Sequence, residues 1–303
     1  YGLSPEIIDL AVERHQPELL VTVDSGIKDV DGVAYAQKLG IEVIITDHHM
    51  PGEKIPEAAV IVNPNMPENK DFPSKAMAGV TVAFYVMLAL RDQLRAQDWF
   101  ALREMPDPNM AEFLDLVALG TVADVVPLDQ NNRTIVFQGL MRIRKGRSCI
   151  AIKALFAVAQ RNIMEATSGD IGFAIAPHLN AAGRLKDISL GVRLLVSDNP
   201  EEADLLAAQL HDLNLERRQI ESEMQKTALK IVNDLAESVS DLPSVLCLYD
   251  PSWHQGVVGI LAARLKERFG CPVIILTEHT EGQLKGSARS VSNFDIRAVI
   301  AAI

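Results

Sequence analysis

The apolar positions in the first sixty residues fall into short continuous runs, separated by one stretch of helical spacing. The runs are Leu19–Val23, Val43–Thr46 and Ala59–Val62, and each contains β-branched residues. Between the first two runs, Val30–Leu39 places apolar residues at helical spacing, and Gly40 follows where a helix would end. Continuous apolar strands with an intervening helix are typical of a parallel sheet that is buried on both faces. We therefore expect βαβ units with right-handed crossovers.

Longer apolar segments follow and predict helices. Gly79–Leu94 and Asn109–Leu119 have the spacing of amphipathic or buried helices, with a polar loop at Arg103–Pro108 between them. Thr121–Pro127 is predicted to be a turn-like segment. The uncharged stretch Ala76–Leu90 is shorter than the ~20 apolar residues of a membrane helix, so a buried core helix suits it better.

The pattern changes after residue 198. Asp198–Glu202 combines an N-cap residue, an early proline and first-turn acids, and no Gly or Pro follows until Pro243. Such a run is long for a helix inside one compact domain. We expect a long connecting helix, either continuous or broken once.

A smaller α/β unit is predicted after this helix. Val245–Tyr249 and Val273–Leu276 have the composition of strands, and Val257–Phe269 between them has helical spacing. Ile296–Ile303 is an apolar, helix-like segment in which the chain stops, so this second unit is expected to be incomplete.

Composition narrows the class of protein. A length of 303 residues corresponds to roughly two domains. With 48% hydrophobic and 23% charged residues, a disordered or collagen-like chain is excluded. The net charge of −11 argues against a broad surface that coats nucleic acid, although it leaves room for a local basic groove, and 5% aromatic residues argue against extensive base stacking.

The cysteines and the first residues bear on the compartment. Cys149, Cys247 and Cys271 form no CxxC pair, which predicts buried free thiols in a reducing cytoplasm rather than disulfides or a zinc site. The chain begins at Tyr1 without an initiator Met or a signal peptide. We expect it to be an excised segment of a longer protein.

Polar side chains follow two consecutive predicted strands where each strand ends. Asp24 follows the first, and Asp47, His48 and His49 follow the second. Because ligands bind at the carboxyl ends of strands in an open parallel sheet, these residues should face one crevice. A turn or cap role remains the alternative for Asp24 alone, whereas two adjacent histidines are harder to explain in that way.

Asp124 adds a third carboxylate, in the apolar run Leu119–Leu128. Burying a lone carboxylate is costly unless a cation or another partner compensates, although a cap beside Thr121 is the alternative explanation. Two Asp with one or two His form a mixed oxygen and nitrogen ligand set that favours Mn²⁺ or Mg²⁺. A pair of such ions ~3.5–4 Å apart would suit phosphodiester cleavage.

Six ordered motifs resemble the DHH phosphoesterase family, and together they resemble its branch of bacterial single-strand-specific exonucleases across nearly the whole chain. They are Val23–Gly26, Thr46–His49, Gly120–Asp124, Pro177–Arg184, Trp253–Gly259 and Gly286–Ser290. A lone Asp-His-His would be a weak signal, whereas six motifs in this order are specific.

The resemblance implies a role for each residue of the metal site. Asp24 would bridge two Mn²⁺ or Mg²⁺ ions, and His48 and Asp124 would complete the ligand shell of one of them. The catalytic residues would be His49 and Asp47. His49 would lie beside the scissile phosphate as a donor or acid/base, and Asp47 would orient its neighbours.

Residues that hold the substrate strand are also implied by the resemblance. Asn180 and Arg184 would face the DNA backbone near the cut. Ser287 and Arg289 would hold the terminal 5′ phosphate, since a guanidinium beside a hydroxyl suits a phosphate end. A surface ion pair is the alternative for Arg289.

Two further features keep alternatives open. His254 and Gln255 are as easily explained by a cap before the following helix as by a DNA contact. Four cations gather within six residues, at Arg142, Arg144, Lys145 and Arg147. Such a cluster can mark a phosphate track, although a solvated loop is the commoner explanation.

The implied organisation is a Rossmann-like DHH catalytic domain at residues 1–197, a connecting helix at 198–238 and a DHHA1-type substrate-binding domain at 239–303. The family's first Asp-x-Asp motif and its Gly-Gly-His motif are absent from the sequence. We therefore expect this piece alone to bind at most one metal ion well and to cleave poorly.

The leading functional hypothesis is a metal-dependent exonuclease that degrades single-stranded DNA from its 5′ end in repair and recombination. A phosphodiesterase acting on short oligonucleotides or cyclic dinucleotides is the nearest alternative. A pyrophosphatase fits less well, and a non-catalytic scaffold would have lost the metal ligands. The resemblance also implies a cytoplasmic bacterial monomer without a membrane role. Its partners would be single-stranded DNA, a single-strand-binding protein and a helicase.

Overall fold

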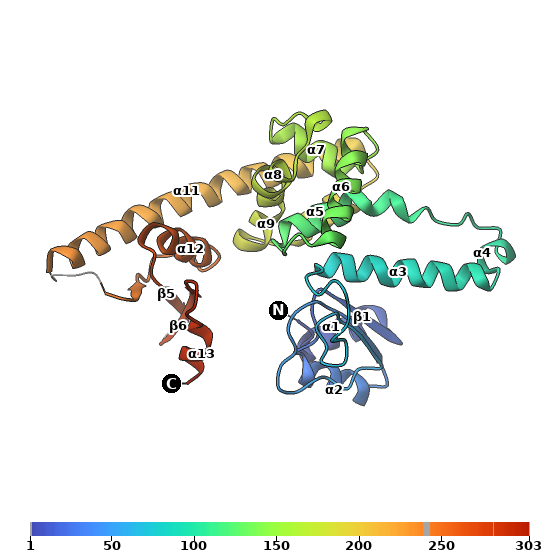
Figure 1. The fold of residues 1–303 in the computed structure, drawn as a ribbon, viewed down its shortest axis with the longest axis horizontal. Coiled ribbons are helices and arrows are strands. Elements are labelled where there is room, and N and C mark those ends of the chain that lie inside the picture. The colour runs from blue at the N-terminus through green and yellow to red at the C-terminus, as the bar shows by residue number, and fades with distance from the viewer. Residues whose placement is uncertain (1, 239–242, 281, 303) are drawn as a thin grey trace. The chain divides into compact units, whose positions relative to one another are not determined.

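The chain divides into two compact units, Tyr1–Ala176 and Pro177–Ile303. The structure, a computed structural model, describes residues 2–238, 243–280 and 282–302. Figure 1 shows the elements of both units along the chain.

A three-stranded parallel sheet forms the start of the first unit. Its strands are β1 (Leu19–Val23), β2 (Glu42–Thr46) and β3 (Val60–Val62), in the order β1-β2-β3. Helices α1 (Pro5–His15) and α2 (Val30–Lys38) are joined to this sheet by a buried cluster. The side chains of that cluster are Ile8, Val33, Ala36, Ile41, Val43 and Ile45. The predicted parallel α/β arrangement is confirmed.

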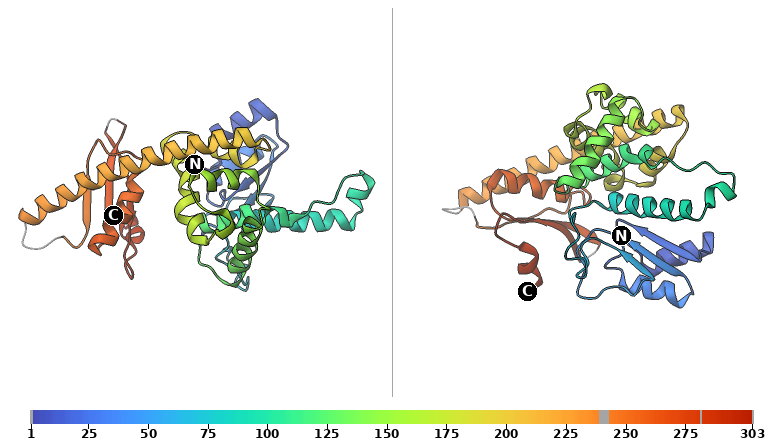
Figure 2. Two further views of the ribbon diagram at one scale, coloured as in Figure 1. Left: turned by 90° about the horizontal axis from the view of Figure 1, so that it is seen from above. Right: turned by 45° about the vertical axis from the view of Figure 1, so that its right-hand side comes forward.

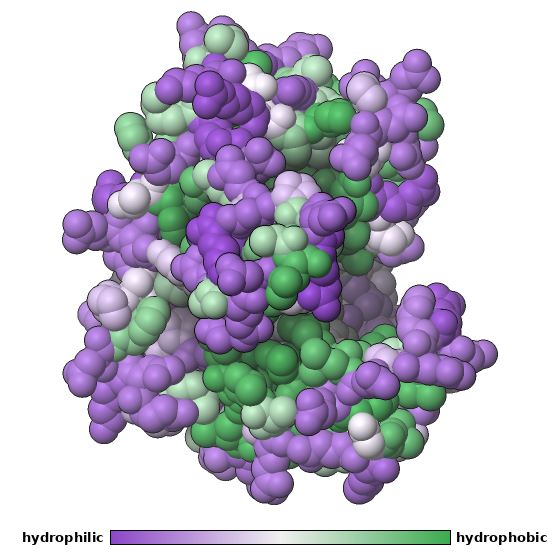
Figure 3. All heavy atoms as spheres, turned by 90° about the vertical axis from the view of Figure 1, so that its right-hand side faces the viewer, coloured by the Kyte–Doolittle hydropathy of each residue, from purple (hydrophilic) through white to green (hydrophobic). Residues whose placement is uncertain are grey.

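The expectation that the strands are buried on both faces is wrong for β1. Leu19, Val21 and Val23 are 45%, 51% and 61% exposed, whereas Leu20 between them packs on the helix-covered face. Successive strand residues point to opposite faces, so a continuously apolar strand leaves one face uncovered when helices pack on the other. Figure 3 shows hydrophobic residues gathered in the lower half of one face of the molecule.

Helices and irregular segments make up the rest of the first unit. They are α3 (Gly79–Ala96), α4 (Trp99–Leu102), η1 (Met110–Phe113), α5 (Leu114–Ala123), α6 (Gln130–Arg144), α7 (Ile150–Val158), η2 (Ile163–Glu165), α8 (Ser168–Asp170) and η3 (Ile171–Ile175). Helices α5 and α6 approach closely at Gly139, where a Cβ would overlap Ala118 and the Leu114 carbonyl. This contact packs the first half of α5 against α6.

Two predictions for these helices need correction. Only Gly79, Thr81 and Val82 of α3 are buried, because the later turns leave apolar side chains such as Leu90 at the surface. The predicted turn-like segment begins later than expected, since α5 continues through Ala123. The loop therefore starts at Asp124.

The second unit contains the long helix and a mixed sheet. Helices α9 (Ala176–Leu185), α10 (Ser189–Val196) and α11 (Pro200–Ser238) come first, followed by β4 (Leu246–Tyr249), α12 (Val258–Phe269), β5 (Val273–Thr280), β6 (Gln283–Arg289) and α13 (Ile296–Ala301). Helix α11 is continuous over its 39 residues (Figure 2). Strand β4 pairs with β5 in parallel and β6 pairs with β5 antiparallel.

Strand β6 was not predicted, because its sequence Gln-Leu-Lys-Gly-Ser-Ala-Arg lacks a β-branched run. Pairing with the buried strand β5 makes it a strand. Its consequence for the site is direct, since Ser287 and Arg289 lie on it with one residue between them.

The three cysteines are more exposed than predicted. Cys149, Cys247 and Cys271 are free, as predicted, but Cys247 is exposed and the other two are half-buried. The prediction of buried thiols is therefore wrong. Cys247 is exposed because successive residues of strand β4 alternate between the buried and the exposed face.

Within the described residues, no helix has the length and apolar character needed to cross a membrane.

Candidate functional site

Asp24 sits in a strained position directly after β1. Its φ angle is 59°, in the left-handed region that Asp tolerates better than most side chains. The Asp24 N–H donates to Thr46 O at 2.9 Å, which ties it to the end of β2. A Cβ at Gly79, the first residue of α3, would overlap the Asp24 carboxylate. The missing side chain at Gly79 is therefore what gives this carboxylate its room.

Asp47 is the buried anchor of the loop after β2, with 1% of its side chain exposed. Its Oδ1 accepts from the N–H groups of His48 (2.7 Å) and His49 (3.1 Å), and its Oδ2 accepts from Ile27 N–H at 3.0 Å. Burial raises the pKa of Asp47, but these donors outweigh burial and the pKa is lowered overall. Asp47 is thus held as a carboxylate that orients its neighbours.

His49 is oriented by this buried carboxylate. Its Nδ1 lies 2.7 Å from Asp47 Oδ1, and about half of the ring is exposed. With the N–H on Nδ1 donating to the carboxylate, Nε2 is left facing away from Asp47. The geometry suits a histidine that acts through Nε2 on a ligand outside the loop.

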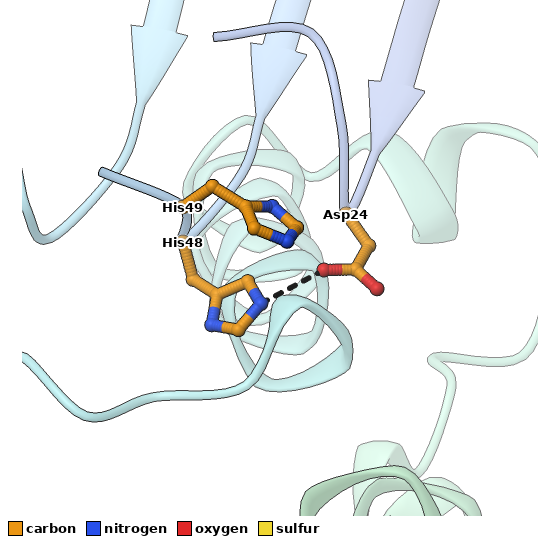
Figure 4. Close-up of side chains that lie close together, drawn as sticks. All are labelled: Asp24, His48 and His49. Atoms are coloured by element: carbon orange, nitrogen blue, oxygen red, sulfur yellow. Dashed lines mark ion pairs between the residues drawn. The ribbon is translucent and has the colours of Figure 1, made fainter. Parts of the chain in front are cut away.

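His48 points at two carboxylates, as Figure 4 shows for Asp24. Its Nε2 lies 3.0 Å from Asp24 Oδ1 and 3.3 Å from Asp124 Oδ2. The contact with Asp24 raises the pKa of His48, against the opposing effect of burial, and the charge of Asp124 adds to the rise. The Nε2 atom is buried without an aligned hydrogen bond among the described residues. One imidazole nitrogen and two carboxylate oxygens therefore lie close together without a well-aligned hydrogen bond to the nitrogen, and such a group of atoms can bind a cation.

Asp124 closes the site from the end of α5. The side chain is 36% exposed despite the apolar run around it, because α5 ends at the residue before it. Partial burial still raises the pKa of Asp124, and the nearby Asp24 carboxylate adds to this effect. A carboxylate at a helix C-terminus also faces the negative end of the helix dipole. A cation between Asp24 and Asp124 would relieve both costs.

The candidate ligands Asp24, His48 and Asp124 therefore fit a divalent cation. The ligand atoms of Asp24, His48 and His49 lie within 4.8 Å of one another, and Asp124 reaches the same His48 nitrogen. Two carboxylates and an imidazole match the oxygen and nitrogen preference of Mn²⁺ and Mg²⁺. The structure thus brings together the residues Asp24, His48, His49 and Asp124, with Asp47 behind them.

Two residues that sequence reasoning missed hold the histidine loop from the segment after β3. Asn63 Nδ2 donates to His49 O at 2.9 Å, and Asn65 Nδ2 donates to His48 O at 2.6 Å. Both asparagines follow a predicted strand end, the position already used to select Asp24 and Asp47. The same signal was therefore present in the sequence and could have found them.

In the second unit, three predicted DNA-contacting residues line one cavity of about 540 Å³. They are Arg184 of α9 with His254 and Gln255 of the loop before α12. Arg184 Nη1 donates to Gly256 O at 3.2 Å, and His254 Nδ1 accepts from Gly256 N–H at 3.1 Å. The last bond closes a turn within the loop, and the N-cap residue of α12, Val257, has no side-chain cap bond, so the His254 ring is left lining the cavity.

Gln255 spans from this loop to strand β5. Its Nε2 donates to Glu278 O at 3.0 Å, and its Oε1 lies 3.1 Å from His279 Nδ1. Asn180 is exposed on α9, one turn before Arg184. Residues four apart share a helix face, so Asn180 and Arg184 form one polar edge.

Ser287 and Arg289 lie together beside the start of α12. Arg289 Nη1 donates to Ser287 Oγ at 2.8 Å. A Cβ at Gly259, in the first turn of α12, would lie 3.1 Å from Arg289 Nη2 and 3.3 Å from Ser287 Oγ. A hydroxyl, a guanidinium and a helix N-terminus in contact make a suitable environment for a phosphate. Gly259 keeps that space open and was not singled out from sequence.

The basic cluster of the first unit is partly structural. Arg144 Nε donates to Ala166 O at 2.8 Å, which fixes a loop to α6. Arg142 and Arg144 are half-buried, whereas Lys145 and Arg147 are exposed. The solvated-loop interpretation fits the exposed pair, and the half-buried pair serves the fold.

The chain is similar in sequence to two known domains and to known exonucleases. Residues 3–121 match the N-terminal domain of the DHH family, and residues 242–303 match the DHHA1 domain. The chain is 54% identical over 297 residues to the single-stranded-DNA-specific exonucleases RecJ of Salmonella typhimurium and Escherichia coli, covering 98% of this chain and 51% of each relative. The chain therefore spans about half the length of these curated relatives.

Solved structures agree in fold. A crystal structure of exonuclease RecJ bound to manganese aligns with a TM-score of 0.79 at 32% identity, covering 99% of this chain and 70% of that chain. RecJ of Thermus thermophilus in complex with Mn²⁺ aligns with a TM-score of 0.81 at 33% identity, covering 99% of this chain and 41% of that chain. With both domain matches in order and a solved relative covered over more than two thirds of its length, the chain belongs to the DHH family, in its RecJ branch.

Proposed function

We propose that this chain forms the nuclease centre of a metal-dependent exonuclease that degrades single-stranded DNA in the 5′ to 3′ direction. The observation that carries the proposal is the convergence of Asp24 and Asp124 on the His48 Nε2 atom, at 3.0 and 3.3 Å. The relatives that share this chain's sequence are named single-stranded-DNA-specific exonucleases. The biological setting would be DNA repair and recombination.

Asp24, His48 and Asp124 would hold Mn²⁺ or Mg²⁺, with Asp24 as the bridge where two ions bind. An ion bound there would supply a Lewis acid that polarises the phosphodiester and activates a water. Two solved RecJ structures are described with Mn²⁺ and a third with Mg²⁺, which supports this choice of cation.

The protein's own residues have separate tasks at the cut. Asp47 fixes the loop and holds the His49 Nδ1 proton, with 2.7 Å between Nδ1 and Oδ1. When protonated, His49 would donate from Nε2 to a phosphate oxygen or to the leaving group. His48 keeps its ring between the two carboxylates, so the ligand geometry is set before substrate arrives.

The polarity of digestion would come from the second unit. Ser287 and Arg289 would hold a terminal 5′ phosphate beside the N-terminus of α12, through charge-assisted hydrogen bonds. Asn180, Arg184, His254 and Gln255 would contact the following sugar-phosphate backbone. The position of the 5′ end would then select the bond that is cut.

The organisation and setting belong to the same proposal. Residues 1–197 would form the catalytic domain, 198–238 the connector and 239–303 the substrate-binding domain. The protein would act as a cytoplasmic monomer together with a single-strand-binding protein and a helicase.

The natural gene product that contains this sequence allows a direct test. We would give it Mn²⁺ and a 5′-phosphorylated single-stranded DNA labelled at either end, beside a His48→Ala variant. Stepwise loss from the 5′ end, abolished by His48→Ala, is the expected result. Hydrolysis of a dinucleotide without digestion of the long strand would contradict the proposal and favour the small-substrate alternative.

A further inference from the structure

Asn132 is a fully buried polar side chain on α6, with 0% exposure. Its amide nitrogen donates twice, to Ala76 O at 2.8 Å and to Pro127 O at 2.8 Å. Its Oδ1 accepts no hydrogen bond from the described residues. The position therefore uses both donors of the amide and leaves its acceptor unused.

Both carbonyls belong to segments that carry the candidate metal site. Ala76 lies three residues before Gly79, whose missing Cβ makes room for the Asp24 carboxylate. Pro127 lies three residues after Asp124, in the loop that follows α5. One amide group thus joins the support of one ligand to the loop of another.

Neighbouring bonds tie the same two segments together. Ser74 Oγ donates to Asp129 Oδ2 at 2.7 Å, and Asp129 in turn accepts the Asn132 N–H at 2.9 Å. Tyr85 of α3 donates to Asn131 Oδ1 at 2.6 Å. The first turn of α6 is therefore a fixed frame, and Asn132 is its buried link to both loops.

We propose that Asn132 is a positioning residue that sets Asp124 at the correct distance from Asp24 for a shared divalent cation. Because it is completely buried, Asn132 acts through the two loops and does not contact substrate. A metal site depends on ligand placement to within ~0.5 Å, so the loss of a link between two ligand-bearing segments should weaken metal binding. This inference rests on the proposed function of the same site.

Mn²⁺ affinity of the whole chain provides the test, measured by electron paramagnetic resonance well below the unfolding temperature. Asn132→Ala removes both donors, and the expected result is a fall in affinity of about 10- to 100-fold, as for other supporting partners of metal ligands. Excess Mn²⁺ should restore the bound fraction. Should Asn132→Ala fail to fold, Asn132→Ser, with one hydroxyl donor, is measured against the same criterion.

The matched control is Thr277→Val, which removes a buried hydrogen bond of the second unit. Thr277 Oγ1 donates to Trp253 O at 2.6 Å, and neither residue belongs to the segments that carry the candidate metal ligands. This variant should bind Mn²⁺ like the parent. If the Asn132 variants lose stability but bind Mn²⁺ as tightly as Thr277→Val, the positioning role is refuted and the proposed function stands. A parent chain that binds no Mn²⁺ would refute both.

Discussion

The candidate metal site and the candidate phosphate site are built on opposite principles. In the first unit, Asp47 is 1% exposed, the His48 side chain is 13% exposed, and Asp24 is held at a positive φ angle. In the second unit, Arg184 and Arg289 are exposed side chains on a regular helix and strand. One site is crowded and rigid, whereas the other is open and solvated.

The difference follows from the task of each site. Ligands of a cation must stand within tenths of an ångström of one another, so the chain accepts backbone strain at Asp24 and the burial of the Asp47 carboxylate to fix them. A phosphate is large and charged, and a guanidinium can recognise it from several directions. The comparison predicts that steric changes harm the first site, and that charge removal harms the second.

The largest effect is expected from Asp124→Asn. It keeps the shape of the side chain but removes one of two carboxylates beside His48 Nε2. Mn²⁺ affinity, measured by titration calorimetry, should fall by more than ~100-fold, since loss of a mere supporting partner costs 10- to 100-fold. The exposed Asp71→Asn is the control. Equal binding by both variants would remove Asp124 from the ligand set.

Gly79→Ala tests the crowding of the same site. The new Cβ overlaps the Asp24 carboxylate, so that ligand must move and Mn²⁺ affinity should drop by roughly 10- to 100-fold. Gly52→Ala is a matched control, because its Cβ would meet Lys54 O at an ordinary 3.6 Å. Calorimetric titration of both variants with Mn²⁺ measures the effect. An unchanged affinity in Gly79→Ala would show that Asp24 does not need this space.

Arg289→Gln tests the open site. The loss of one charged contact to a phosphate should weaken binding of 5′-phosphorylated single-stranded DNA by about 10-fold and reduce the salt slope by about one. Fluorescence anisotropy with 5′-phosphate and 5′-hydroxyl strands measures both quantities. The exposed Arg268→Gln should leave the preference for the 5′ phosphate intact. If Arg289→Gln keeps that preference, the 5′ phosphate binds elsewhere.

The stability of the metal-free chain and its affinity for Mn²⁺ should depend on pH in opposite directions. Because the pKa of His48 is raised in the folded state, its protonation stabilises the metal-free fold at pH values below the ordinary histidine pKa of about 6.5. This contribution is lost as pH rises through the higher pKa of the folded state. Thermal unfolding of the metal-free chain should therefore occur at lower temperature at pH 8 than at pH 6. Mn²⁺ affinity should change the other way, because the ligand is the neutral imidazole. Both trends should be reduced in His48→Gln, and their persistence there would assign them to another group.

The smallest effect concerns strain beside Asp124. Val125 has a φ angle of 59° and is 85% exposed, an unfavourable combination for a β-branched residue. Val125→Gly should raise the free energy of unfolding by about 0.5–1 kcal/mol in urea denaturation, because glycine adopts this conformation without cost. Val126→Gly, at a neighbour without a positive φ, should lower it. The same sign for both would mean that the strain at Val125 is negligible.

Much of the framework was predictable because its signals are local. The three parallel strands, helix α2 and the long helix α11 follow from apolar runs, stop residues and the absence of Gly and Pro. Strand β6 was not predictable from its own composition, because only pairing with β5 makes it a strand. Exposure of β1 was missed for a related reason, since a strand's sequence does not say which of its faces a helix will cover.

By itself, the sequence determined which side chains carry chemistry and the order in which they occur. The polar residues after the strand ends, at Asp24 and at Asp47 to His49, were visible because apolar runs stop there. Tertiary structure alone decided that Gly79 makes room for Asp24, and that Asn132 joins two loops 56 and 5 residues away. The physical reason is that composition and spacing act along the chain, whereas steric fit and hydrogen bonding depend on segments that meet only after folding.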